Sequence, residues 1–224
     1  MKKHLLIFLL FMPLCLFANK YKNYYITKVN IIGHLNNDGS IDVTEDRTYK
    51  FKGKYKYAYQ KLIKTDGITY SNFSVSEDNT IYTLSDKKEK GNFQIIDNDS
   101  DYEIRWNFKA NKESRTFTLK YKVHNIIKRY NDVAVLYHKF IGDEWKKKQQ
   151  NVTIKIEPPE NISDLDLQAW LHGPLWGEYK LNNDGSIFAW IENLPKKTFF
   201  EIRAMYPESI FGNAIQVDKF IKSF

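Results

Sequence analysis

The sequence predicts an all-β fold, an antiparallel β-sandwich with a short C-terminal amphipathic helix. Three observations lead to this prediction. Short runs of alternating apolar and polar residues recur along the chain, Gly and Asn-Asp turn signals separate them, and no helix of convincing length precedes residue 213. We therefore expect a signal peptide over 1–18, the sandwich domain over 19–212 and an amphipathic segment over 213–224.

The clearest element is a hairpin from Tyr24 to Phe51, turning at Asn36-Asn37-Asp38-Gly39. Glycine tolerates the positive φ that a tight turn needs, so an Asp-Gly pair between alternating runs is a strong hairpin signal. One face of the first strand is expected to carry Tyr25, Thr27, Val29, Ile31, Gly33 and Leu35. The matching face of the second is expected to carry Ile41, Val43, Glu45, Arg47, Tyr49 and Phe51.

Glu45 and Arg47 thus fall on the inward face among apolar residues. Buried charges are costly unless they are paired, so these two are candidates for a buried polar network or site. The alternative is a sheet end open to water, or a bulge that changes the register.

Tyr55, Tyr57 and Tyr59 alternate with lysines and Ala58 directly after the hairpin. Aromatic residues at period two are typical of strands, so we expect a strand with its tyrosines packed on the sheet. The alternative is an exposed ribbon of aromatic and basic side chains.

Further strand patterns follow to residue 206, and the run from Phe117 to Val123 alternates most cleanly. Trp106 and Trp190 lie within strand patterns and are expected in the core. The heptapeptide Leu-Asn-Asn-Asp-Gly-Ser-Ile occurs twice, at 35–41 and at 181–187, without similarity beyond it. We interpret this as two hairpins with the same turn chemistry, not as a duplicated domain.

The tail places Val217, Phe220, Ile221 and Phe224 at helical spacing on one stripe, which predicts the amphipathic helix. The chain stops within this pattern. We therefore expect a longer parent protein.

The first residues have the features of a secretory signal: Lys2 and Lys3, an apolar stretch from Leu5, and a small residue at Ala18. Cys15 is the single cysteine, so the processed chain relies on its core without disulfides. The net charge of +7 falls to +5 without Lys2 and Lys3. An exported basic chain is expected to meet a cell-envelope polymer or protein, and no nucleic acid.

The order of several short motifs resembles the extracytoplasmic N-terminal domain of the YciQ-like predicted membrane proteins, a bacterial and archaeal family of unknown function. The motifs are Asn37–Glu45, Tyr49–Gly53, Thr116–Val123, Leu136-Tyr137, Ile141–Trp145, Pro158, Gly173-Pro174, Asn193–Pro195 and Met205–Pro207. The resemblance covers essentially the whole mature chain. It implies membrane helices in a missing segment after this domain, and a location on the extracytoplasmic face of the membrane (periplasm or cell surface), or secretion if the chain is complete. Where the family pattern has an arginine shortly after the glycine, this chain has Tyr59-Gln60-Lys61, so the resemblance supplies no fixed ion pair for Glu45.

No catalytic, metal or cofactor motif is present. His34, His124, His138 and His172 lack partners at metal-ligand spacing, and there is no nucleophile elbow or phosphate-binding glycine loop. We therefore expect a binding or sensing module without a cofactor, not an enzyme. The alternatives are a secreted glycan-acting enzyme, which needs two facing carboxylates, and a structural adhesin, which needs a free edge strand.

The candidate ligand surface is the segment from Ala169 to Gly177, where Trp170 and Trp176 flank a Gly-Pro turn beside His172. Exposed aromatic rings near such a turn suit stacking on sugars or peptides, with His172 as a polar contact. The alternative is that both tryptophans cap the open end of the core.

Overall fold

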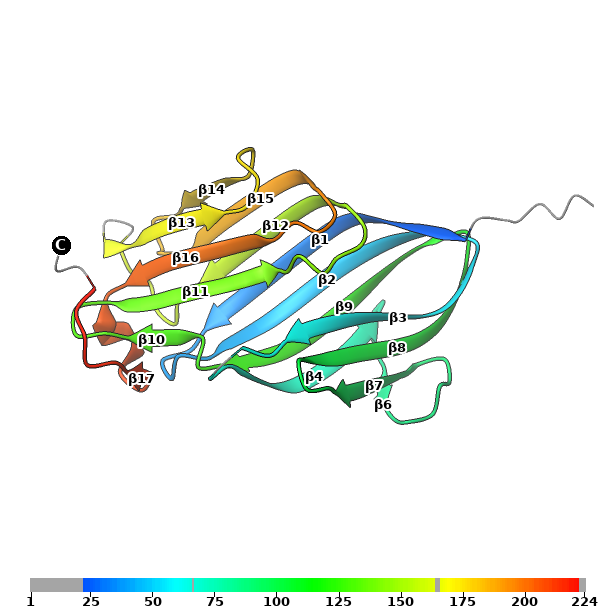
Figure 1. Cartoon of the computed structure of the whole chain (residues 1–224), viewed down its shortest axis with the longest axis horizontal. Helices are drawn as coiled ribbons and strands as arrows, with labels where there is room; N and C mark the ends of the chain where they lie inside the picture. Colours follow the sequence, from blue (N-terminus) through cyan, green and yellow to red (C-terminus); the bar gives the residue numbers. More distant parts are fainter. Residues whose placement is uncertain (1–21, 66, 164–165, 222–224) are drawn as a thin grey trace, which may run out of the picture.

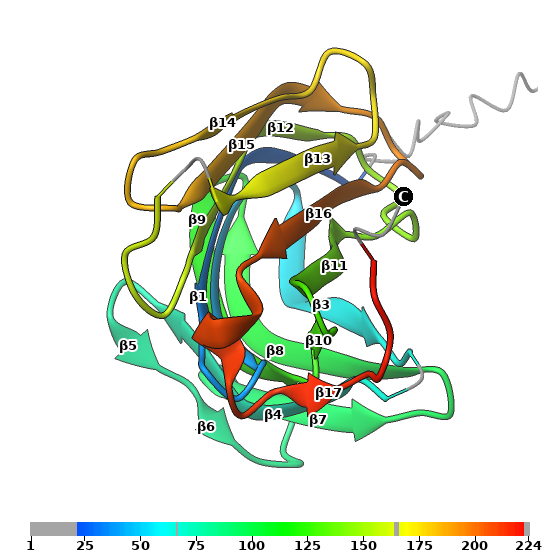
Figure 2. The same ribbon diagram turned by 90° about the vertical axis from the view of Figure 1, so that its left-hand side faces the viewer.

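The computed structural model describes residues 22–65, 67–163 and 166–221, and within them the chain forms two layers of β-sheet (Figure 1). The predicted signal peptide lies outside the described residues. An eight-stranded sheet curves behind two smaller sheets, which together make the second layer (Figure 2). The prediction of an all-β sandwich is confirmed.

The large sheet contains the predicted hairpin at its centre. Its strands, in spatial order, are β14 (Glu178–Leu181), β15 (Ile187–Leu194), β12 (Gln149–Glu157), β1 (Asn23–Leu35), β2 (Ile41–Lys52), β9 (Ser114–His124), β4 (Thr69–Glu77) and β5 (Thr80–Ile81).

The second layer consists of a five-stranded and a four-stranded sheet. The first has the order β13 (Gln168–His172), β16 (Phe200–Tyr206), β11 (Ala134–Ile141), β10 (Ile127–Arg129) and β17 (Ile215–Gln216). The second has the order β3 (Lys54–Ile63), β8 (Asp101–Asn111), β7 (Asn92–Asp97) and β6 (Thr83–Leu84). A short 3₁₀ turn, η2, spans Glu208–Phe211.

The sheets are mixed, which corrects the expectation of a purely antiparallel sandwich. β12 runs parallel to β1, with Val152 opposite Val29. Parallel neighbours need a long crossover, and residues 36–148 supply it. They form half of the strands of the large sheet and most of the second layer before the chain returns to β1. β10 and β17 are also parallel, as are β6 and β7.

The hairpin turn forms as its residues predict. Gly39 has a φ of +76° and donates to the Asn36 carbonyl at 2.9 Å, while Ser40 N–H donates to the Asp38 carboxylate at 2.9 Å. The second copy of the heptapeptide forms the same bonds between β14 and β15, where Gly185 donates to the Asn182 carbonyl at 2.8 Å. Identical local chemistry therefore gives identical turns, as expected.

A bulge at Thr27 changes which residues of β1 face inward. The pairing with β2 shifts between Ile26 and Lys28, so Ile26 and Val29 are both buried. The predicted face was therefore right from Val29 to Leu35 and wrong for Tyr25 and Thr27. The extra residue of a bulge reverses the alternation before it.

The core lies between the layers and is rich in aromatic rings. Phe108 and Phe117 pack with ring centroids 4.7 Å apart, and Trp106 contacts Phe117 at 5.6 Å. Trp106 is buried as predicted, whereas Trp190 lies on the outer face of the large sheet and is half-buried.

The predicted C-terminal helix is wrong for residues 213–221. Ile215 pairs with Lys128 in β17, and Val217 N–H donates to the Arg129 carbonyl at 2.8 Å, so the segment is extended where it meets β10. Strand pairing overrides the helical spacing of the apolar residues. Residues 222–224, with Phe224 among them, lie outside the described residues.

Candidate functional site

The second layer is split along a seam between its two sheets. Among the described residues, β3 is an edge strand that pairs only with β8, and β10 covers β11 only up to Leu136. Residues 60–63 of β3 and 137–140 of β11 line one pocket, so the two strands face each other without pairing. Figure 1 shows β3 and β11 as the neighbouring strands of the two small sheets.

A groove with a volume of about 600 Å³ lies at this seam, and we call it the tyrosine–lysine groove. One wall is β3 itself and the other is the loop 142–148 that joins β11 to β12. Its lining residues are Lys22, Tyr24, Tyr49, Phe51, Lys54, Tyr55, Lys56, Tyr57, Ala58, Tyr59, Gln60, Lys61, Glu144, Trp145 and Lys146.

Aromatic rings form the apolar surface of the groove. Tyr55 packs edge-on against Tyr24 at 5.9 Å and against Phe51 at 4.7 Å. Tyr57 and Tyr59 are instead 48% and 43% exposed. The predicted strand is confirmed, but packing of all three tyrosines on the sheet is wrong. The alternative of an exposed aromatic and basic ribbon describes Tyr57 and Tyr59.

The groove carries positive charge. Five of its lining residues are lysines and one, Glu144, is a carboxylic acid. Burial raises the pKa of Glu144, which favours its neutral form. Lys61 is paired with Asp101 at 2.9 Å, while Lys54 and Lys56 are exposed beside the groove. An anionic ligand is therefore favoured over a cationic one.

A buried polar network lies under the groove. Glu45 and Arg47 are 1% and 3% exposed and form an ion pair, and Arg47 also donates to Gln149 at the start of β12. Gln60 of β3 donates to the second oxygen of Glu45 at 2.8 Å. The Arg47 guanidinium lies 4.1 Å from the centroid of the Trp145 ring, a cation–π contact.

This network fixes the two walls of the groove. Gln60 attaches β3 to β2, and Trp145 attaches the loop to the same guanidinium. The Trp145 carbonyl also accepts a 2.8 Å bond from Lys197 N–H, which holds the loop from its other side. Burial lowers the pKa of Arg47 to about 10, so the guanidinium remains charged at neutral pH.

A second, polar pocket of about 360 Å³ adjoins the groove on the far side of Glu144 and Trp145. His138, Tyr70 and Glu201 are among its lining residues. Burial lowers the pKa of His138 to about 4 and raises that of Tyr70 to about 12, so both side chains are neutral near pH 7. Glu201 accepts a hydrogen bond from Tyr137, which raises the pKa of Tyr137.

The candidate surface around Trp170 and Trp176 lies apart from the groove lining. Trp170 and Trp176 are 39% and 59% exposed, so neither ring caps the core. Trp170 lies 5.3 Å from the Arg203 guanidinium, and Trp176 Nε1 donates to the Asn193 carbonyl at 3.2 Å. His172 is exposed and meets the ring of Tyr137 edge-on at 6.1 Å.

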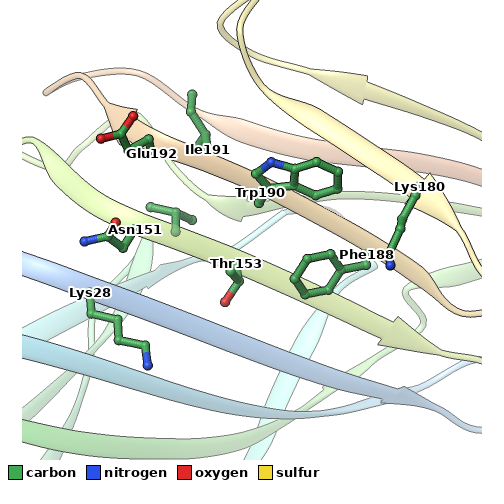
Figure 3. Close-up of a pocket in the computed structure, with 9 residues that line it drawn as sticks. Lys28, Asn151, Thr153, Lys180, Phe188, Trp190, Ile191 and Glu192 are labelled. Carbon is green, nitrogen blue, oxygen red and sulfur yellow. The ribbon is translucent and has the colours of Figure 1, made fainter.

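A shallow hollow of about 570 Å³ lies on the outer face of the large sheet (Figure 3). The rings of Phe188 and Trp190 lie 5.6 Å apart at 30° along β15, and Lys180 lies 5.8 Å from the Phe188 centroid. Thr153 of β12 stands beside them (Figure 3). The half-buried position of Trp190 corrects the expectation that it belongs to the core.

Sequence reasoning placed Glu45 and Arg47 on the inward face but missed Trp145, Glu144 and the groove itself. The usable signal was the alternation of lysine and tyrosine from Lys54 to Tyr59. The sequence predicted no fixed ion pair for Glu45 from the segment Tyr59-Gln60-Lys61, and there Gln60 supplies a hydrogen bond while Arg47 supplies the ion pair.

Within residues 22–65, 67–163 and 166–221, no three His, Cys, Asp or Glu side chains are grouped as metal ligands would be. Across the same ranges, no helix has the length and apolar character to span a membrane.

Fold and site together define an all-β domain with a split second layer and a basic aromatic groove at the split. The chain belongs to the family described as predicted membrane protein (DUF2207), N-terminal domain, whose model matches residues 25–206. This confirms the resemblance found in the sequence. A search of curated proteins finds no match.

Among solved structures, the chain is similar to native leukotriene A4 hydrolase from Saccharomyces cerevisiae, with a TM-score of 0.52 and 12% identity over 83% of this chain and 30% of that one. The complex of the yeast hydrolase with bestatin has a TM-score of 0.52 and 11% identity, over 83% of this chain and 29% of that one. An M1 zinc metallopeptidase from Deinococcus radiodurans has a TM-score of 0.46 and 9% identity, over 80% of this chain and 42% of that one. The chain thus spans less than half of each protein, and the likeness to the yeast hydrolase extends to the fold alone.

Proposed function

We propose that this domain is the extracytoplasmic binding module of a membrane-anchored protein, and that it binds an acidic ligand in the tyrosine–lysine groove. The observation that carries the proposal is the composition of that groove, in which five tyrosines and five lysines accompany one carboxylic acid. Tyrosine rings provide rigid contact area with a polar end, and lysines attract anions. The network under the groove holds both walls in place before a ligand arrives.

The test uses poly-L-glutamate as the probe and tryptophan fluorescence as the signal, because Trp145 lines the groove. The matched variants are Lys54→Glu with Lys56→Glu at the groove and Lys87→Glu with Lys88→Glu in an exposed loop. Both pairs change the net charge equally. We expect the groove pair to weaken binding about tenfold, the ratio given by ~1.4 kcal/mol, and the loop pair to have little effect. Equal losses in both pairs would mean non-specific attraction and would refute the proposal.

The alternative of a glycan-acting enzyme would rest on Glu144 and Glu201, which both line the polar pocket. Glycan hydrolysis by the protein that disappears in Glu144→Gln would replace our proposal. The adhesin alternative would rest on the free edge of β3 and predicts self-association of the unaltered protein.

We also retain the surface of Trp170, His172 and Trp176 as a proposed second contact with cell-envelope material, because both indoles are exposed. In Trp176→Ala, a loss of binding to cell-wall material with thermal stability unchanged would support it. A large loss of stability would show that the ring serves the fold.

A further inference from the structure

We infer that the acidic ligand is an extended polypeptide segment that adds as a new strand to the free edge of β3. This inference rests on the proposed function and names the chemistry of its ligand. Strand addition joins a peptide to a sheet through main-chain hydrogen bonds, while pockets for alternate side chains give specificity.

The length of β3 sets it apart from the other sheet edges. β3 has 10 residues, whereas the other edge strands, β5, β6, β13, β14 and β17, have two to five. Proteins usually keep edge strands short or cover them, because an open edge presents unpaired N–H and C=O groups. A long open edge beside a groove is therefore suited to pairing with an added strand.

The groove also follows the strand rather than crossing it. Every residue from Lys54 to Lys61 lines the groove, and 60–63 line the polar pocket. The edge is thus accompanied by open space from Lys54 to Leu62, and at its end the Ile63 carbonyl accepts a hydrogen bond from Tyr70 at 3.1 Å. A segment of about eight extended residues would span roughly 26 Å beside it.

The positive charge of the groove favours one kind of ligand over others. Lys54 and Lys56 lie along β3, and Lys22 and Lys146 also line the groove, whereas Lys61 is already paired with Asp101. Two copies of β3 would bring like charges together, which disfavours pairing of this edge with itself. A segment with acidic residues complements the same lysines.

The tyrosines define the second requirement. In a strand alternate side chains point to opposite faces, so one set of the ligand's side chains would point toward Tyr24, Tyr55 and Trp145 and the other toward the outer surface. The fitting segment therefore alternates acidic and apolar residues. An acidic polysaccharide could meet the lysines but could not continue the backbone ladder.

The test is amide hydrogen exchange along β3, measured by NMR with a blocked peptide of about eight residues that alternates Glu and Val. The alternate β3 amides that face β8 are already bonded, and those on the free edge are the reporters. We expect the reporter amides to exchange at least about tenfold more slowly in the complex. The Lys54→Glu, Lys56→Glu variant at the same peptide concentration should show no such slowing.

The outcomes separate this inference from the proposed function. The peptide could change Trp145 fluorescence while the exchange rates of the β3 amides stay the same. That result would refute strand addition and leave groove binding intact. Stronger groove binding by dextran sulfate than by the peptide would refute the polypeptide. If neither polyglutamate nor the peptide binds at the groove, the proposed function fails, and this inference fails with it.

Discussion

At the scale of single residues, the sequence predicts the burial of the ion pair on β2 but not the residues that bind it. Glu45 and Arg47 could be predicted as buried because the alternation places them between Val43 and Tyr49. Their partners could not be predicted, since Gln60 and Gln149 are 15 and 102 residues away from the atoms they bind. Such contacts depend on how the sheets pack and leave no local signal in the sequence.

Replacing Arg47 with Met should destabilise the protein by about 3–5 kcal/mol, because Glu45 would remain charged and buried without its partner. Replacing Glu45 with Leu as well should restore part of the loss. Urea unfolding measures both. The control is Arg105→Met, whose partner Glu103 is 2.9 Å away in a more exposed pair, and it should cost under about 1 kcal/mol. A similar loss for Arg47→Met and Arg105→Met would contradict the role of burial.

His138 should make the protein sensitive to acid. Its pKa of about 4 in the folded state lies below the ordinary histidine value of 6.5, so the unfolded chain binds the proton more readily. Stability from this group is present above pH 6.5 and is lost as the pH falls toward 4, by at most about 3 kcal/mol.

The measurement is urea unfolding from pH 7 to pH 4 for the protein and for His138→Gln. Glu144 has a raised pKa and acts in the opposite direction, but it is present in both proteins and largely cancels in the difference. The variant should lose less stability with acid than the parent. Parallel curves would show that His138 is not responsible.

At the scale of elements, strands and turns were the most predictable features. The two copies of the heptapeptide form the same turn because Asp, Gly and Ser bond within it. The bulge at Thr27 and the strand β17 were missed, since each depends on a partner strand. The turn at Gly39 also contacts the C-terminal segment, because a Cβ built there would lie 2.8 Å from the Cβ of Ala214.

Gly39→Ala should therefore lower the free energy of unfolding by more than the strain of a positive φ alone would. Gly67 is the matched control, since its φ of +77° equals that of Gly39 within a degree and its Cβ would meet nothing within 4 Å. We expect a loss of about 1 kcal/mol for Gly67→Ala and about 2–4 kcal/mol for Gly39→Ala by urea unfolding. Equal losses would mean that the turn and the C-terminal segment can separate without cost.

At the scale of the whole molecule, alternation and turns predicted a sandwich but could not reveal that its second layer is two separate sheets. Each strand satisfies the same local pattern whether or not a neighbour pairs with it. The seam arises because β12 returns parallel to β1 in the large sheet, and the loop 142–148 that leads to it occupies the space beside β3. Pairing between distant segments thus decides where the groove lies.

The open edge of β3 leads to a prediction about the molecule in solution. If lysines keep this edge from pairing with a second copy, then replacing Lys54 and Lys56 with Thr should permit association, because Thr favours strands and carries no charge. Sedimentation at rising protein concentration should show the parent as a monomer and the variant as a growing fraction of dimer. The control, Lys87→Thr with Lys88→Thr, loses the same charge from an exposed loop and should stay monomeric. A variant that remains monomeric would show that charge is not what protects the edge, whereas a parent that associates by itself would favour the adhesin.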